Sequence, residues 1–183
     1  MTEVTASKGK KKAIPRVPLP EQEADVRRRN FDEVPLGYTP EMAREEASRC
    51  LQCRKPACVQ GCPVSVDIPG FIHFIKEGDF SGAIRNLWGQ NALPAVCGRV
   101  CPQEIQCEGV CILAKKGDPV AIGNLERFAA DYERAHGSGV LPPQAPATGK
   151  KVAVVVLYER LNAVGYTSCC VRGYTMWVIP LAL

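Results

Sequence analysis

Eight of the ten cysteines in this 183-residue chain lie in two groups of similar size. The first group has the pattern Cys-x2-Cys-x4-Cys-x3-Cys-Pro over residues 50–63, and the second has Cys-x3-Cys-Pro-x4-Cys-x3-Cys over residues 97–111. Thiols at such close spacing have three common uses in proteins: disulfide bonds, structural zinc sites and iron–sulfur clusters. The rest of the sequence helps to distinguish these uses.

Disulfide bonds persist in oxidising compartments, and nothing in the sequence indicates that the protein is exported to such a compartment. The lysine-rich stretch at residues 8–12 is not followed by the apolar segment of a secretory signal, and no apolar run reaches the roughly 18 residues of a membrane helix. We therefore expect a cytoplasmic protein with reduced thiols and no membrane partner. The net charge of +4 is modest, so we interpret the lysines as a solvated tail, with no nucleic-acid partner.

The cysteine spacing favours iron–sulfur clusters over zinc. Structural zinc usually uses paired Cys-x2-Cys units, and only Cys50 and Cys53 form one here. Both groups contain the Cys-Pro step of iron–sulfur proteins, in which the last cysteine of a run can bind a neighbouring cluster, as Cys62 could. Cys107 and Cys111 would share one face of a helix and could hold two clusters close together. A zinc-stabilised interaction module and a non-functional gene fragment remain the alternatives.

The segments that must position these cysteines read mainly as α-helices. Thr39 and Pro40 predict the start of a helix that runs into the first cysteine. Asp67 is the N-cap candidate of a second helix that Gly78 should end, the helical pattern restarts at Asp79, and these two helices should pack as a hairpin. A fourth helix is expected between Ile122 and Gly137.

The composition divides the chain into four parts. Residues 1–37 are polar and rich in proline, which predicts an arm that lies on a surface or stays mobile, with order beginning near Thr39. Residues 38–136 form the helical domain, and residues 137–150 read as a linker. Residues 151–183 begin with a strand-like β-branched run, "KVAVVV", of the kind found in buried parallel sheets.

Several ordered blocks give the chain a resemblance to the N-terminal iron–sulfur domain of the glutamate synthase small-chain family, and to the related N-terminal domain of dihydropyrimidine dehydrogenase. The resemblance covers roughly residues 16–156. Its main blocks are "RNFDEVPLGYTPEMAREEASRCLQC", "GCPVSVDIPGFIHFIKEGDF", "LPAVCGRVCPQEIQCEGVC" and "IGNLERFAADY".

The resemblance implies a mainly α, helical double-cluster fold of the α-helical ferredoxin type, with two [4Fe-4S] clusters whose ligands are interleaved. One cluster would be held by Cys50, Cys53, Cys58 and Cys111. The other would be held by Cys62, Cys101, Cys107 and Glu126, with Cys97 as the substitute ligand if Glu126 does not bind. No catalytic residue is implied.

The implied function is electron transfer between FAD and the redox centre of a partner such as the glutamate synthase large chain. FAD and NADPH are expected only in a full-length family member, because Leu157, Tyr158 and Glu159 stand where the glycine-rich FAD turn would be. We therefore expect residues 151–183 to be a truncated or frameshifted start of a flavin domain with a vestigial strand, and Cys169 and Cys170 to be incidental. A chain of this form should not oxidise NADPH alone.

Overall fold

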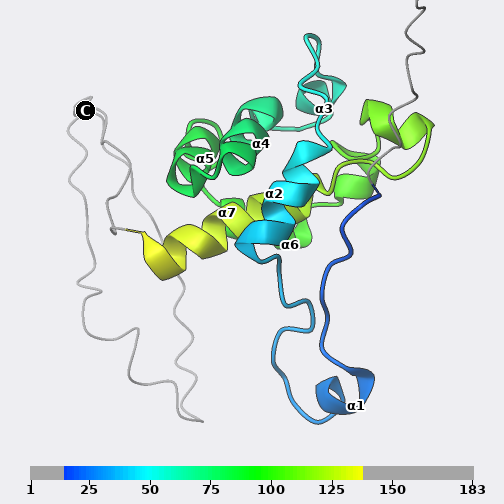
Figure 1. Cartoon of the computed structure of the whole chain (residues 1–183), viewed down its shortest axis with the longest axis vertical. Helices are drawn as coiled ribbons and strands as arrows, with labels where there is room; N and C mark the ends of the chain where they lie inside the picture. Colours follow the sequence, from blue (N-terminus) through cyan, green and yellow to red (C-terminus); the bar gives the residue numbers. More distant parts are fainter. Residues whose placement is uncertain (1–14, 138–183) are drawn as a thin grey trace, which may run out of the picture. The chain divides into compact units, whose positions relative to one another are not determined.

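The computed structural model describes residues 15–137, which are mainly helical (Figure 1). The α-helices of this range are α1 (Ala24–Arg27), α2 (Pro40–Ser48), α3 (Ala57–Gln60), α4 (Ile68–Glu77), α5 (Phe80–Trp88), α6 (Pro94–Val100) and α7 (Ile122–His136). Two 3-10 helices, η1 (Gln103–Ile105) and η2 (Ile112–Lys115), lie between α6 and α7. The predicted helical character is confirmed for the described residues, whereas the expected strand at 151–156 and both Cys169 and Cys170 lie outside them.

Helices α2, α4 and α5 begin where the sequence predicts. The Thr39 hydroxyl accepts a hydrogen bond from the backbone at the start of α2, and Pro40 occupies the first helical position. Asp67 and Asp79 accept equivalent hydrogen bonds at the starts of α4 and α5. Gly78, at a φ of 85°, ends α4 in a left-handed conformation that favours glycine. Local capping therefore fixes the turn of the α4–α5 hairpin.

Helix α7 lies against four other helices and forms the centre of the core. It packs on α6, α5, α2 and α4, while α4 and α5 pack on each other; Figure 1 shows α2 across α7 and the α4–α5 pair beside them. An aromatic cluster closes one end, with the Phe80 ring 5.0 Å from Phe128 and 4.6 Å from Tyr132 between centroids. The largest fully buried apolar side chains are those of Phe71, Ile72, Ile75, Ile84, Leu87 and Leu125.

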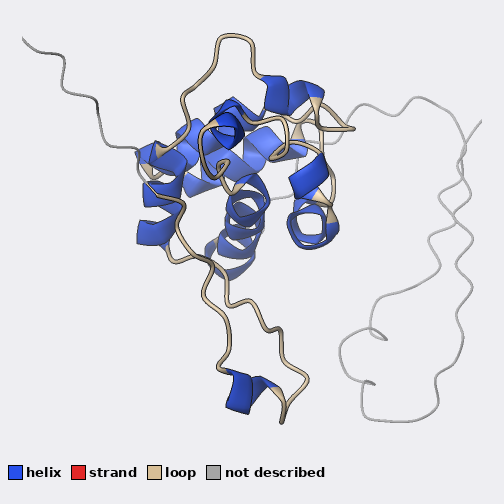
Figure 2. Cartoon of the chain, turned by 90° about the vertical axis from the view of Figure 1, so that its right-hand side faces the viewer, coloured by secondary structure: helices blue, strands red, loops and turns tan. Residues whose placement is uncertain are grey.

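Ordered structure begins well before Thr39, so that expectation is wrong. Val17 is buried in the core, and its carbonyl accepts a 2.7 Å hydrogen bond from the Tyr38 hydroxyl. An antiparallel bridge joins Glu21 to Pro35, and the segment between them includes α1 (Figure 2). Polar contacts with residues distant in the sequence, rather than an apolar face, hold most of the arm in place. Its sequence therefore shows no hydrophobic periodicity.

The buried carboxylate of Glu46 ties the arm to the helices. This side chain is 0% exposed. It accepts hydrogen bonds from the backbone of Val17 and of Ala121, each 2.8 Å long, and pairs with Arg49 at 2.6 Å. Arg49 in turn donates to the carbonyls of Asp118 and Pro119, which precede α7. One charged pair thus connects the arm, α2 and the start of α7.

None of the helices within residues 15–137 is long and apolar enough to cross a membrane.

Because Glu46 connects the arm, α2 and the start of α7, replacing it should destabilise the fold strongly. In Glu46→Gln the buried ion pair between Glu46 and Arg49 is lost, and breaking a buried pair from one side costs about 3–5 kcal/mol. Urea unfolding of the full chain measures the difference, with the exposed Glu45→Gln on the same helix as the control, expected within about 0.5 kcal/mol of wild type. Equal stability of the two variants would show that the pair does not hold the arm.

Candidate metal centre

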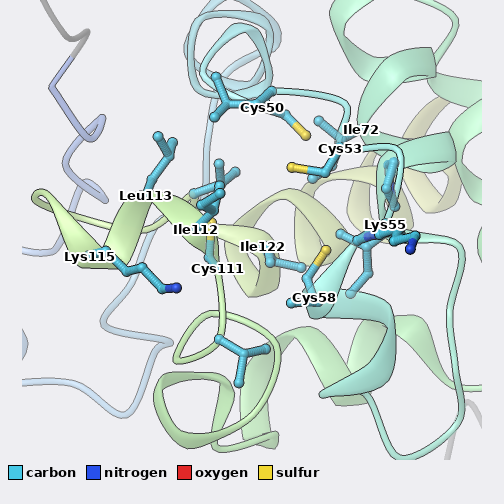
Figure 3. A pocket seen from close by; sticks show the side chains of 17 residues that line it. Cys50, Cys53, Lys55, Cys58, Ile72, Cys111, Ile112, Leu113, Lys115 and Ile122 are labelled. Carbon is cyan, nitrogen blue, oxygen red and sulfur yellow. The ribbon is translucent and has the colours of Figure 1, made fainter.

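Four of the predicted ligands line one cavity. Cys50, Cys53, Cys58 and Cys111 contribute to the wall of a cavity of about 170 Å³. Figure 3 shows the sulfur atoms of the first three pointing toward this common space, with Cys111 beside it. Three of these cysteines belong to the first sequence group, and Cys111 is the last residue of the second group. The fold therefore brings together thiols that are more than 50 residues apart in the chain.

Local backbone geometry positions these four thiols. Cys50 follows the end of α2, Cys58 lies on α3, and Cys111 immediately precedes η2. Between Cys50 and Cys53 the chain turns at Gln52, which adopts a φ of 49°, a left-handed conformation uncommon outside glycine. The Gln52 amide also donates to the carbonyl of Pro69 at 3.1 Å, which anchors the turn to α4.

The first cavity has largely apolar walls with two basic side chains. Its lining includes Ile68, Ile72 and Ile122, together with Lys55 and Lys115. Such walls exclude water and lower the local dielectric.

Burial raises the pKa values of thiols in this cavity. The pKa of Cys58 rises to about 11, because burial disfavours the thiolate and the charges of Cys50 and Cys111 add to the effect. Burial also raises the pKa of Cys50, with Cys53 and Cys111 acting in the same direction. Because a metal binds thiolates, binding here has to displace protons, so affinity should fall as the pH falls.

The remaining predicted ligands lie near one another at a second place. Burial raises the pKa of Cys101 to about 11, and the nearby charges of Cys97, Glu126 and Cys62 contribute to the rise. Burial raises the pKa of Cys107 to about 12, and Cys62 and Glu126 again contribute, after Glu108. The four second-cluster candidates and the substitute Cys97 therefore share one neighbourhood.

Glu126 is a buried carboxylate on α7, only 9% exposed. Burial raises its pKa to about 7, while a hydrogen bond from Asn91 acts in the opposite direction. The Asn91 amide nitrogen lies 2.7 Å from one Glu126 oxygen, and the Asn91 amide oxygen lies 3.6 Å from the sulfur of Cys97. A buried carboxylate among thiols is consistent with a ligand role, which the sequence pattern alone does not reveal.

Close packing of α6 on α7 brings Glu126 to the cysteines of α6. A Cβ atom built on Gly98 would lie 2.6 Å from the backbone nitrogen of Arg127, so only glycine fits this contact. Arg127 and Arg99 both pair with Glu33 of the arm and with Asp131 of α7, at distances of 2.7 to 3.3 Å. Steric fit and an ionic network thus hold the two helices together.

Cys107 and Cys111 do not lie on a regular helix, contrary to the expectation from their spacing. They occupy the turns between η1 and η2. Cys111 lines the first cavity, while Cys107 lies near Cys62 and Glu126 at the second site. The turn between η1 and η2 therefore directs the thiols of Cys107 and Cys111 to different sites.

Within residues 15–137, no group of three or more His, Cys, Asp or Glu side chains could hold a single metal ion; the four cysteines of the first site instead line a cavity.

Two residues of this region were missed by sequence reasoning. Gln52 shapes the first loop, and nothing in its type signals a left-handed turn. Asn91 precedes Leu93 and Pro94 in "NALP", and its side chain accepts a hydrogen bond from the Leu93 backbone at 2.9 Å. An asparagine whose side chain accepts from the backbone two residues further on is typical of such a turn, so that signal was present in the sequence.

Comparison with known proteins adds the decisive observation. Residues 27–138 match the family model described as dihydropyrimidine dehydrogenase domain II, 4Fe-4S cluster. The chain belongs to this family. The match covers every helix from α2 to α7 and all eight cysteines of the two groups, and it confirms the predicted relationship to iron–sulfur oxidoreductases. The described part of the chain is therefore a 4Fe-4S domain of the oxidoreductase type.

Relatives of known identity match the same region. The chain is 40% identical over 125 residues to the NAD-dependent dihydropyrimidine dehydrogenase subunit PreT of Escherichia coli K12. It is 38% identical over 144 residues to the glutamate synthase [NADPH] small chain of that organism. These alignments cover 68% and 78% of this chain but 30% of each relative. The chain thus aligns with less than a third of the length of these dihydropyrimidine dehydrogenase and glutamate synthase subunits.

The Gly98 contact generates a prediction on stability. In Gly98→Ala the added methyl group meets the backbone of α7, and overpacking of this kind costs about 1–3 kcal/mol. That cost exceeds the gain of up to about 1 kcal/mol from the better helix propensity of alanine. Gly89→Ala is the control, because residue 89 is exposed and the added Cβ atom would meet only the Asn86 carbonyl oxygen, at 3.2 Å. Urea unfolding of both variants would refute the packing argument if Gly98→Ala were the more stable.

Proposed function

We propose that the chain binds two [4Fe-4S] clusters and passes single electrons between them. Cys50, Cys53, Cys58 and Cys111 would hold the first cluster. Cys62, Cys101, Cys107 and Glu126 would hold the second, with Cys97 as the substitute ligand. The observation that carries the proposal is the convergence of four thiols from both sequence groups on one cavity.

The first cavity is large enough for a ligand bigger than a single metal ion. An apolar cavity of roughly 150 Å³ binds a molecule the size of benzene, and this one has a volume of about 170 Å³. Soft thiolates are the ligands that iron–sulfur clusters prefer. The donor set and the space at this site therefore fit a [4Fe-4S] cluster.

The protein's own residues position and shield the clusters. When bound, a [4Fe-4S] cluster accepts and donates electrons at a potential set by its ligands, its burial and nearby hydrogen bonds. The isoleucines of the first cavity exclude water, and Lys55 and Lys115 add positive charge. The four-residue spacing of Cys107 and Cys111 ties the two sites to one short turn, which favours electron transfer between them.

The electron donor and acceptor are proposed from the relatives. Their names specify NAD for the dehydrogenase subunit and NADPH for the glutamate synthase small chain. We propose that electrons come from a reduced nicotinamide through FAD in a full-length protein and leave to a partner's redox centre, such as that of a glutamate synthase large chain. A reducing cytoplasm would keep the ligand thiols available.

The first test is the cofactor content of the full chain purified without oxygen. We expect iron and acid-labile sulfide in equal amounts, about eight of each per chain, and a broad visible absorbance that dithionite bleaches. A colourless, folded chain containing zinc and no sulfide would refute the proposal and favour the interaction module. Expression with cluster-assembly proteins ensures that loading is not the limiting step.

The second test addresses the interleaved ligand sets. Cys111→Ser and Cys107→Ser should each lose about four of about eight irons, because each removes a ligand of a different cluster. Combining Cys53→Ser with Cys111→Ser should cost no more iron than either change alone, whereas combining Cys53→Ser with Cys107→Ser should remove both clusters. The control is Cys170→Ser, which should retain full iron content. If Cys53→Ser and Cys111→Ser have additive effects, the two residues do not share a cluster.

A further inference from the structure

The side chain of Asn91 contacts both candidates for the last ligand of the second cluster. It lies between α5 and α6 and is 7% exposed. Its amide nitrogen donates to a Glu126 oxygen at 2.7 Å, and its amide oxygen lies 3.6 Å from the sulfur of Cys97. The same amide oxygen accepts a hydrogen bond from the backbone of Leu93. One buried amide thus links a carboxylate, a thiol and the loop that precedes α6.

The chemistry of the amide allows only one orientation. A backbone N–H can only donate, so the Leu93 contact requires the amide oxygen. An ionised carboxylate can only accept, so the Glu126 contact requires the amide NH2 group. Turning the amide over would break both hydrogen bonds and would place the amide oxygen against the buried Glu126 carboxylate. The position of the Glu126 carboxylate is therefore fixed from the α5–α6 loop.

The Asn91 side chain contacts the two candidate ligands, Glu126 and Cys97, in different ways. Asn91 engages only the Oε1 atom of Glu126, and within residues 15–137 Oε2 makes no hydrogen bond that would compete with a metal. The thiol of Cys97 instead donates a 3.6 Å hydrogen bond to the amide oxygen and also interacts with the side chain of Cys101. A cluster bound beside Cys101 thus meets a carboxylate whose position is already fixed and a thiol that already has hydrogen-bond partners.

We propose that Asn91 is the positioning residue that makes Glu126, rather than Cys97, the last ligand of the second cluster. The inference rests on the proposed function. Without the amide, Glu126 loses its hydrogen-bond donor and Cys97 is released. Because iron–sulfur clusters prefer thiolates, Cys97 should then replace Glu126 as the ligand.

The test compares two Asn91 variants, each with and without Cys97→Ser, in the full chain loaded and purified without oxygen. Asn91→Leu removes both side-chain hydrogen bonds at similar volume. Asn91→Ser keeps a hydroxyl that can accept from Leu93 but is too short to reach Glu126, so it preserves the loop. Asn86→Leu is the matched control, because it removes a different side-chain amide, half-buried and near the end of α5, that bonds to Asp67.

The first readout is iron content. Cys97→Ser alone should keep both clusters, because Glu126 is the ligand in wild type. Cys97→Ser combined with either Asn91 variant should lose about four of about eight irons, because both candidate ligands are then compromised. Loss of iron in Cys97→Ser alone would make Cys97 the native ligand and overturn the inference. Retention of all iron in the combined variants would also overturn it.

The second readout is alkylation of native, loaded protein by N-ethylmaleimide, followed by peptide mapping of Cys97. This thiol should react in wild type and in Asn86→Leu, and should react at least tenfold more slowly in Asn91→Leu and Asn91→Ser, where it binds iron. Equal labelling in all four proteins would show that Asn91 only orders its loop. Absence of iron and sulfide from wild type would instead refute the proposed function, and with it this inference.

Discussion

The close packing of α6, α5, α4 and α2 around α7 is the constraint on which the rest of the structure depends. Helix α7 contributes Leu125 to the core and Glu126 to the candidate second site, so burial and ligand placement depend on the same turn of helix. Gly98 permits the contact with α6 by leaving no Cβ atom against the α7 backbone. Any shift of α7 would therefore change the hydrophobic core and the candidate ligands together.

Buried carboxylates connect this packing to segments that have no apolar face. Glu46 joins the arm to α2 and to the residues before α7. Glu108 accepts hydrogen bonds from Arg16 of the arm and from the Gly123 backbone of α7. Because both carboxylates are nearly fully buried, losing their donors would leave an unpaired buried charge, so these contacts specify where the loops lie. The loops that carry the cysteines are thus fixed by polar contacts at their ends.

The sequence predicts local structure here better than it predicts the long-range contacts. Thr39 and Asp67 cap helices as expected, and Asp79 caps the helix expected to begin there, because a capping side chain acts within three residues of its own position. The ordered arm was not expected, because Val17 and Glu46 meet only in the folded chain. The convergence of Cys111 with Cys50 follows from no local rule, and it was expected only through a family resemblance. Asn91 was missed although its turn to Leu93 is a local signal, because its contact with Glu126 joins residues that are 35 positions apart and meet only in the folded chain.

The central claim is that thiols from both cysteine groups surround two separate iron–sulfur clusters. The most direct measurement is anomalous diffraction at the iron absorption edge from crystals grown without oxygen. The account predicts two groups of iron peaks, one in the cavity between Cys50, Cys53, Cys58 and Cys111, and one beside Cys107 and Glu126. A single group, or isolated single-atom peaks at either place, would contradict it.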